Sequence, residues 1–251
     1  MDKEELQLKK RLMDLAEQSY RNNIFTFSGF LSLSEQQVLL QAEREFSARF
    51  ELFGGNSNCE RCMVRFGSED DLGYVQEYPI VCLHVKPLIA KFSDTFSHRD
   101  FLGAIMNLGI ERSTIGDIVL QDNTAFLYCH EKMAQYLMDE LTKVKHTHVK
   151  CEKIESVELL PQKEPVPKEF IVASGRIDVV VAKVYNLSRS ACVELFRSKR
   201  IFVNGKTQEN NSYFLKEKDV VTARGFGKFI FEKQLGQTKK ERVKILVSEY
   251  K

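Results

Sequence analysis

Residues 78–155 alternate strand-like and helix-like patterns in a fixed order, and this order limits the folds that the segment can adopt. Apolar, β-branched runs are typical of strands, whereas apolar residues spaced by three or four positions are typical of helices. The segment contains in turn a strand (YPIVCLHV), a helix (HRDFLGAIMNLGI), two strands joined by a turn (GDIVL and TAFLYCH), a helix (EKMAQYLMDELTKV) and a strand (THVKCEKI). This β-α-β-β-α-β order predicts a ferredoxin-like, RRM-like domain. RNA-recognition domains share the order, but so do proteins of many unrelated functions.

Two aromatic residues of this segment, Phe126 and Tyr128, lie on the same face of their predicted strand. Such residues can stack on RNA bases, or they can face the helices and form the core. The glycine and the charges that usually flank a base-stacking strand are missing here. We therefore expect Phe126 and Tyr128 to belong to the core, beneath the helices.

The N-terminal segment predicts a small unit of helices and strands. Residues 4–21 have the pattern of an amphipathic helix. Ser34 followed by Gln37 matches a capping box and predicts a second helix after it. RFELFGG and CMVRFG then form a predicted hairpin.

These patterns predict the fold class α+β, with an N-terminal α/β unit at residues 1–73 and the ferredoxin-like domain at residues 74–158. Residues 159–173 include three prolines among charged residues, which is typical of a stiff, exposed linker. The last predicted domain covers residues 174–251.

The net charge of +2 hides an asymmetry between the two parts of the chain. Residues 174–251 contain 17 Lys and Arg against 8 Asp and Glu, a charge of +9. The remaining residues contain 20 cations and 27 anions, a charge of −7. A basic domain attached to an acidic body is typical of a protein whose basic part binds nucleic acid.

The basic part predicts two short helices and a hairpin. Ile177, Val180, Val181 and Val184 have helical spacing, and the Ser188 hydroxyl is placed to cap a second helix. Three arginines form one cationic stripe beside an apolar face of that helix: Arg189, Arg197 and Arg200. Asn204-Gly205 then predicts a tight hairpin turn, because both residues tolerate positive φ.

Four sequence blocks in this part resemble the RNA-binding S4 domain, first named in small-subunit ribosomal protein S4. They are GRID, LSRS, RIFVNGK and LKEKDVV, and they have the order and spacing of that family. The resemblance implies an αL-like surface of two helices and a hairpin that binds structured RNA through its phosphates. It implies contacts from Arg176, Ser188, Arg189, Arg197, Lys199, Arg200, Asn204, Lys206, Arg224 and Lys228.

One residue departs from the S4 pattern. Lys199 stands after the second helix, where the family often has glycine. A lysine with positive φ costs on the order of 1 kcal/mol relative to glycine. We therefore expect the turn to differ locally from that of the family.

The central segment, HRDFLGAIMNLGIERSTIGDIVLQDNTAFLYCHEKMAQYLMDELTKV, resembles the central domain of YlmH-type proteins, so that the resemblance extends over the whole chain. It implies a ribosome-associated RNA-binding factor without catalysis, active in translation quality control. The implied partners are rRNA or tRNA on the large ribosomal subunit, with peptidyl-tRNA retained after stalling. Arg99 and Arg112 of this segment are secondary candidates for RNA contacts. We expect a cytoplasmic monomer.

Two alternatives belong to other classes of protein. GRID also resembles the start of the catalytic block of pseudouridine synthases, which would make Asp178 catalytic; the following residues differ from that block. A link to cell division would instead make the acidic body a docking surface for a protein. The RNA-binding reading predicts no catalytic residue.

The six cysteines predict neither a metal site nor disulfides. Cys59 and Cys62 form a single CxxC, and zinc requires two further ligands that the sequence does not place nearby. No run of eighteen apolar residues predicts a membrane helix, and the charged N-terminus is unlike a secretory signal. We therefore expect free thiols, no metal and no cofactor.

Overall fold

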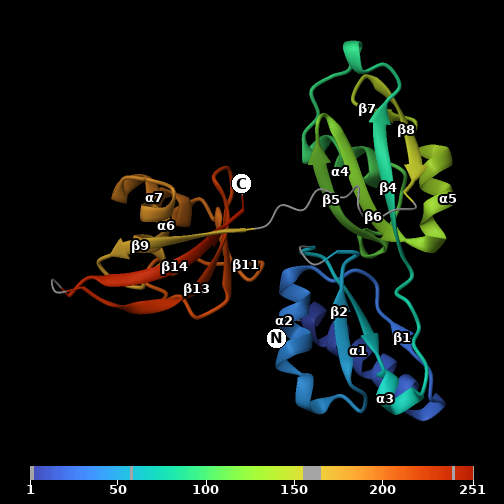
Figure 1. Ribbon diagram of the computed structural model, residues 1–251, viewed down its shortest axis with the longest axis horizontal. Coiled ribbons are helices and arrows are strands. Elements are labelled where there is room, and N and C mark those ends of the chain that lie inside the picture. Colours follow the sequence, from blue (N-terminus) through green and yellow to red (C-terminus); the bar gives the residue numbers. More distant parts are fainter. Residues whose placement is uncertain (1–2, 57–58, 155–164, 239–240, 251) are drawn as a thin grey trace. The chain divides into compact units, whose positions relative to one another are not determined.

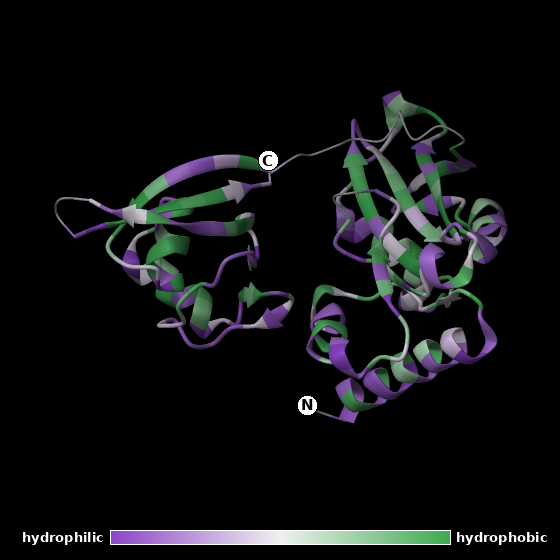
Figure 2. Ribbon diagram, turned by 60° about the horizontal axis from the view of Figure 1, so that its bottom comes forward, coloured by the Kyte–Doolittle hydropathy of each residue, from purple (hydrophilic) through white to green (hydrophobic). Residues whose placement is uncertain are grey.

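A computed structural model describes residues 3–56, 59–154, 165–238 and 241–250. The chain forms two compact units, Met1–Gln162 and Lys163–Lys251, and each is α+β as predicted (Figure 1). Apolar residues are frequent in the strands of both units and alternate with hydrophilic residues along the helices (Figure 2). Among the described residues, no helix combines the length and the apolar character needed to cross a membrane.

The first unit begins with a small three-stranded sheet and two helices. Its elements are α1 (Lys3–Asn22), β1 (Thr26–Phe27), α2 (Leu33–Gln41), a 3-10 turn η1 (Glu43–Glu45), β2 (Phe50–Phe53), β3 (Met63–Phe66) and α3 (Glu69–Leu72). The strand order is β1-β3-β2, and the predicted helix and hairpin are confirmed. Leu12 and Ala16 of α1 pack with Leu39 of α2 and Val64 of β3.

The capping box of α2 lies two residues earlier than predicted. Ser32, and not Ser34, is the N-cap: its hydroxyl accepts a hydrogen bond from the backbone N–H of Glu35. The Glu35 carboxylate accepts one in return from the Ser32 N–H, at 2.7 Å. Ser34 and Gln37 have the same spacing as Ser32 and Glu35, but Ser34 cannot be the N-cap because the helix already begins at Leu33.

The central part of this unit has the predicted ferredoxin-like arrangement. Its elements are β4 (Ile80–Pro87), η2 (Ala90–Phe92), α4 (His98–Met106), η3 (Arg112–Thr114), β5 (Ile115–Gln121), β6 (Thr124–His130), α5 (Glu131–Glu140), β7 (Lys143–Val144) and β8 (Thr147–Lys153). The strand order is β5-β6-β4-β8-β7, in which the short β7 is an addition to the predicted four strands. Phe101 and Ile105 of α4, Leu137 of α5, and Leu83 and Leu127 of the sheet form the core on one face.

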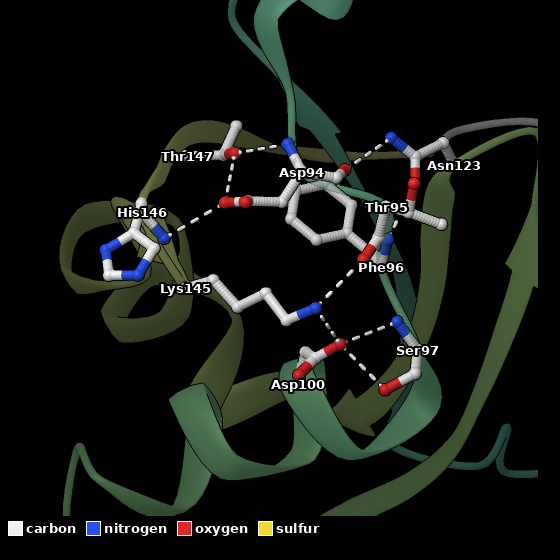
Figure 3. A network of polar contacts seen from close by, with 9 residues as sticks. All are labelled: Asp94, Thr95, Phe96, Ser97, Asp100, Asn123, Lys145, His146 and Thr147. Atoms are coloured by element: carbon white, nitrogen blue, oxygen red, sulfur yellow. Dashed lines mark hydrogen bonds and ion pairs between the residues drawn. The ribbon is translucent and has the colours of Figure 1, made fainter.

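A network of polar side chains fixes the long connection between β4 and α4 (Figure 3). The Asp94 carboxylate accepts hydrogen bonds from the His146 N–H at 3.1 Å and from the Thr147 hydroxyl at 2.9 Å. The Asn123 side-chain oxygen accepts one from the Phe96 N–H at 2.8 Å. Lys145 forms an ion pair with Asp100 at the start of α4, at 3.0 Å. The connection is therefore attached to the β5–β6 and β7–β8 turns.

The second face of the central sheet is covered by the N-terminal part of the same unit. Phe126 and Tyr128 are 6% and 2% exposed and form a cluster with Phe30 and Met63. The Tyr128 hydroxyl accepts a hydrogen bond from the Asn56 side chain at 2.6 Å. Both aromatic residues are therefore core residues, but they lie on the face opposite the helices and not beneath them. Neither ring is free to stack on a base.

Charged residues also join the two parts of the first unit. The Asp117 carboxylate on β5 accepts hydrogen bonds from the backbone N–H groups of Glu60, at 2.6 Å, and Arg61, at 3.0 Å. The Arg61 guanidinium donates to the backbone oxygens of Phe30, at 2.7 Å, and Ile115, at 3.1 Å. Because these contacts and the shared core make residues 3–154 one compact body, a domain boundary near residue 73 stays a proposal.

The second unit is a six-stranded antiparallel sheet with two helices. Its elements are β9 (Val166–Val172), α6 (Ile177–Val184), α7 (Arg189–Arg197), β10 (Ile201–Val203), β11 (Lys206–Thr207), β12 (Asp219–Ala223), β13 (Gly227–Gln237) and β14 (Val243–Glu249). The strand order is β11-β10-β12-β13-β14-β9. Ile177 and Val181 of α6 and Phe196 of α7 pack with Val221 and Phe229 of the sheet.

The predicted linker at residues 159–173 is wrong in its second half. Val166–Val172 form β9, which pairs with β14 from Val166 opposite Glu249 to Val172 opposite Val243. Val172 is buried and Phe170 is partly buried, so the strand contributes to the core. Pro167 is tolerated because β9 is an edge strand, so that its missing N–H interrupts hydrogen bonding to no second neighbouring strand. Residues 159–164 of the predicted linker lie outside the described residues.

Candidate nucleic-acid interface

Helix α7 separates an apolar face from a cationic face. Ser188 is its N-cap, and the Ser188 hydroxyl accepts a hydrogen bond from the Ala191 N–H at 3.1 Å, as predicted. Cys192, Leu195 and Phe196 are buried against α6 and the sheet. Arg189 and Arg197 are exposed. Arg197 pairs with Glu194 at 3.4 Å, and an ion pair as exposed as this one contributes little to stability.

The turn after α7 keeps the left-handed backbone that the S4 family usually gives to glycine. Lys199 has φ of +54°. Its N–H donates to the Phe196 oxygen at 3.0 Å, and the Arg200 N–H donates to the Leu195 oxygen at 2.8 Å. These two bonds are those of a Schellman motif. The expectation that the turn differs locally is therefore wrong: the turn is retained, and lysine occupies its left-handed position.

We expect Lys199→Gly to stabilise the chain by up to about 1 kcal/mol, because glycine adopts the left-handed conformation without a steric cost. The ion pair that is lost, from Lys199 Nζ to Glu209 at 3.0 Å, is exposed and contributes little. Urea unfolding monitored by circular dichroism measures the difference. Ser198→Gly is the matched control and should destabilise, since Ser198 has φ of −81°. Equal or lower stability of Lys199→Gly would contradict the prediction.

The predicted hairpin joins β10 and β11 through Asn204 and Gly205, whose φ angles are +50° and +77°. The Asn204 side chain is used inside the fold. Its oxygen accepts a hydrogen bond from the Val220 N–H at 2.9 Å, and its nitrogen donates to the buried Asp219 carboxylate at 2.9 Å. Asn204 therefore fixes the hairpin to β12.

Three more of the predicted cations are held by neighbouring groups. Arg200 donates a side-chain hydrogen bond to the Arg224 backbone oxygen, and the Arg224 N–H donates to the Arg200 oxygen at 2.9 Å. The Arg224 guanidinium lies 4.3 Å from the centre of the Phe202 ring. Lys228 Nζ lies 3.7 Å from the centre of the Tyr250 ring. Contacts of this kind already restrict the long side chains. Binding of an anion would therefore cost less side-chain conformational entropy.

Arg176 is attached to the first turn of α6. Its Nε and Nη2 donate to the two oxygens of Asp178, at 3.1 and 2.8 Å. Hydrogen bonding to Asp178 raises the pKa of Arg176 above its usual value. Asp178 is itself buried and also accepts from the Val179 N–H at 2.9 Å. The Asp178 carboxylate therefore positions Arg176 and the start of the helix.

The two secondary candidates for RNA contacts, Arg99 and Arg112, differ in exposure. Arg99 is exposed on α4. Arg112 turns inward and donates to the backbone oxygens of Ile115 and Gly116, the latter at 3.2 Å. Burial, with the nearby positive charge of Arg61, lowers the pKa of Arg112 to about 10. Arg112 is thus a structural residue, and only Arg99 presents its charge at the surface.

The cysteines are free thiols in the fold. Burial, with the negative charge of Asp117, raises the pKa of Cys59 to about 12 and that of Cys62 to about 11. Both thiols are therefore protonated at neutral pH and poor nucleophiles. Within the ranges that the structure describes, no three His, Cys, Asp or Glu side chains are grouped so that they could hold a metal ion.

The helix pair α6 and α7, the Asn-Gly hairpin and the exposed cations define an RNA-binding protein of the S4 class. Comparison with known families agrees: residues 175–221 match the S4 domain. Residues 75–158 match the family described as "Putative RNA-binding domain in YlmH". The chain therefore combines a YlmH-type domain with a C-terminal S4 domain, which confirms the resemblance found in the sequence.

Two known proteins are similar to this chain. One is the "Ribosome-associated protein quality control protein P2" of Bacillus subtilis, with 27% identity over 241 residues, 94% of this chain and 91% of that protein. The other is the solved structure of "Cell division protein ylmH from Streptococcus pneumoniae", with a TM-score of 0.51 and 18% identity. That alignment covers 64% of this chain and 97% of the other, and it shows a common fold.

Proposed function

We propose that this protein is a non-catalytic RNA-binding factor that acts on the ribosome. Its S4 domain would bind structured rRNA or tRNA through phosphates. The observation that carries the proposal is the exposed cationic face of α7 and the following turns, in a part of the chain with a charge of +9. The contacts that we propose are Arg176, Arg189, Arg197, Lys199, Arg200, Lys206, Arg224 and Lys228, with Arg99 as a separate secondary contact.

The proposed mechanism is electrostatic. Each Lys or Arg that neutralises a phosphate releases condensed counterions, and this entropy gain drives binding. Phosphate contacts orient the protein without reading sequence, so selectivity would come from the shape of the RNA. Ser188 and Asn204 act indirectly, because one caps α7 and the other fixes the hairpin.

The name of the Bacillus relative supports ribosomal quality control as the process. In finer detail, we propose that the protein acts in the cytoplasm as a monomer. Its target would be the large subunit that retains peptidyl-tRNA after stalling. Nothing in this proposal requires a metal or a cofactor.

Sedimentation of cell lysate through a sucrose gradient tests the proposal. We expect the wild-type chain to travel with large subunits and Arg189→Ala/Arg197→Ala to remain at the top. The matched control is Arg11→Ala/Arg44→Ala, which removes two exposed arginines from the first unit and should sediment as the wild type. If the wild type remains at the top at both low and high salt, the ribosome is not its target.

The same gradient tests the adaptor alternative, and an assay of RNA modification tests the enzyme alternative. A protein adaptor that docks through the acidic first unit would tolerate the loss of Arg189 and Arg197. An RNA-modifying enzyme with Asp178 as its catalytic group would lose turnover, and not only retention, in Asp178→Asn. Mass analysis of rRNA and tRNA from a deletion strain would then reveal a missing modified nucleoside.

A further inference from the structure

The second unit contains a groove of about 680 Å³ between the end of β9, the outer side of α6 and the start of α7. We propose that this groove takes one unstacked nucleotide of the bound RNA, with the base on its apolar floor and the phosphate on its cationic rim. The inference rests on the proposed function and adds how the RNA is selected. A groove of this volume lies within the range of about 300 to 1,000 Å³ that is typical of small-ligand sites.

The floor of the groove is apolar and partly open. Ile171 of β9 lines it and is 47% exposed, although it is a large aliphatic residue. Val179 of α6 and Leu187 of the α6–α7 connection line it as well and are only partly buried by the core. A flat base placed there would remove apolar surface from water on both partners. A duplex could not enter, because its bases are already stacked.

Arg176 provides a flat surface at the side of the groove. It lines the groove, and the two hydrogen bonds to Asp178 fix the plane of its guanidinium. The same two bonds use two of the five N–H donors of the guanidinium and hold its plane in one orientation. Guanidinium planes stack on unpaired bases in RNA complexes. We therefore assign the face of the Arg176 guanidinium to the base.

The rim of the groove is positively charged. Lys183, Arg189 and Arg242 line it, and the one acidic residue that lines it, Asp178, is already paired with Arg176. Arg189 comes from the start of α7, Lys183 from the end of α6 and Arg242 from the residue before β14. Cations from three segments around an apolar floor match a nucleotide, which has an apolar face and an anionic end. They do not match a neutral apolar ligand or a cation.

The test uses the full-length chain and three RNA hairpins that share one stem. The first is fully paired, the second has one bulged adenosine, and the third has an abasic residue at the bulge. The abasic RNA keeps the phosphates and the flexibility of the bulge and lacks only the base. We expect the adenosine bulge to bind about tenfold more tightly than the abasic bulge, since stacking of a base contributes about 1 to 3 kcal/mol.

Ile171→Asn should reduce this tenfold preference to less than about twofold, since the base then meets a polar floor. Val166→Asn is the matched control: Val166 lies on the same strand, is 42% exposed and does not line the groove. Its preference should equal that of the wild type. Arg176→Lys keeps the charge and removes the flat group, so it should also reduce the preference.

The outcomes distinguish a failure of the groove proposal from a failure of the proposed function. If the wild type binds none of the hairpins, RNA binding itself fails. If it binds the adenosine and abasic bulges equally, the groove inference is overturned and the proposed function remains. Adenosine monophosphate alone should bind more weakly than millimolar; binding at micromolar concentration without RNA would assign the groove to a free nucleotide and overturn the inference.

Discussion

Arg189→Ala/Arg197→Ala is expected to weaken binding of a structured RNA by about 50-fold near 0.1 M salt. Each phosphate contact adds roughly 0.7 to 0.9 to the slope of log affinity against log salt, so each contributes about five- to eightfold at that concentration. The two arginines lie on one exposed face of α7, where neither has a strong partner among the described residues that would compete with a phosphate.

The salt dependence tests the mechanism more sharply than affinity at one concentration. The slope for the double variant should be less steep than the wild-type slope by about 1.4 to 1.8. Fluorescence anisotropy of a labelled hairpin, titrated over a range of KCl concentrations, gives both quantities. Arg11→Ala/Arg44→Ala should leave the slope unchanged. A variant that loses affinity with an unchanged slope would have lost shape complementarity or folding, and not phosphate contacts.

Local patterns account for what could be predicted from the sequence. The spacing of apolar residues in the central segment was enough to predict its β-α-β-β-α-β order, because this spacing can be recognised from neighbouring residues alone. Asn204-Gly205 identified a hairpin since two adjacent residues with positive φ suffice for it. The exposed position of Arg189 and Arg197 follows in the same way from the apolar face of α7, although their contact with RNA stays a prediction.

The features that could not be predicted depend on residues far apart in the chain. β9 was taken for a linker because Pro167 and the prolines before it hide a strand whose partner, β14, lies more than 70 residues away. The cover over Phe126 and Tyr128 comes from Phe30 and Met63, in the preceding part of the unit. A tertiary partner of this kind leaves no local pattern.

The site itself shows the same limit. Asn204 and Arg112 have the polarity of RNA contacts, but each is used inside the fold by backbone groups that only the tertiary structure brings near. At Lys199 the error was in energetics: about 1 kcal/mol was judged enough to change a turn. Two backbone hydrogen bonds and the buried apolar face of α7 outweigh such a cost.

Asp117→Ala is expected to lower the free energy of unfolding of the first unit by about 3 kcal/mol. Two effects add. The N–H groups of Glu60 and Arg61 lose their acceptor, and an unsatisfied donor that is shielded from water costs about 1 to 3 kcal/mol. Arg61 and Arg112, both partly buried, also lose the negative charge that offsets their mutual repulsion.

Asp117→Asn should be intermediate, because the amide oxygen still accepts one hydrogen bond while the charge is lost. Asp14→Ala removes an exposed carboxylate from α1 of the same unit and should change stability by no more than about 0.5 kcal/mol. Hydrogen exchange followed by mass spectrometry resolves the two units separately. Protection should fall in peptides from β3, β5 and β6, and it should not change in peptides from β12 to β14. Equal protection of Asp117→Ala and wild type in β5 would show that Asp117 does not hold the two parts of the unit together.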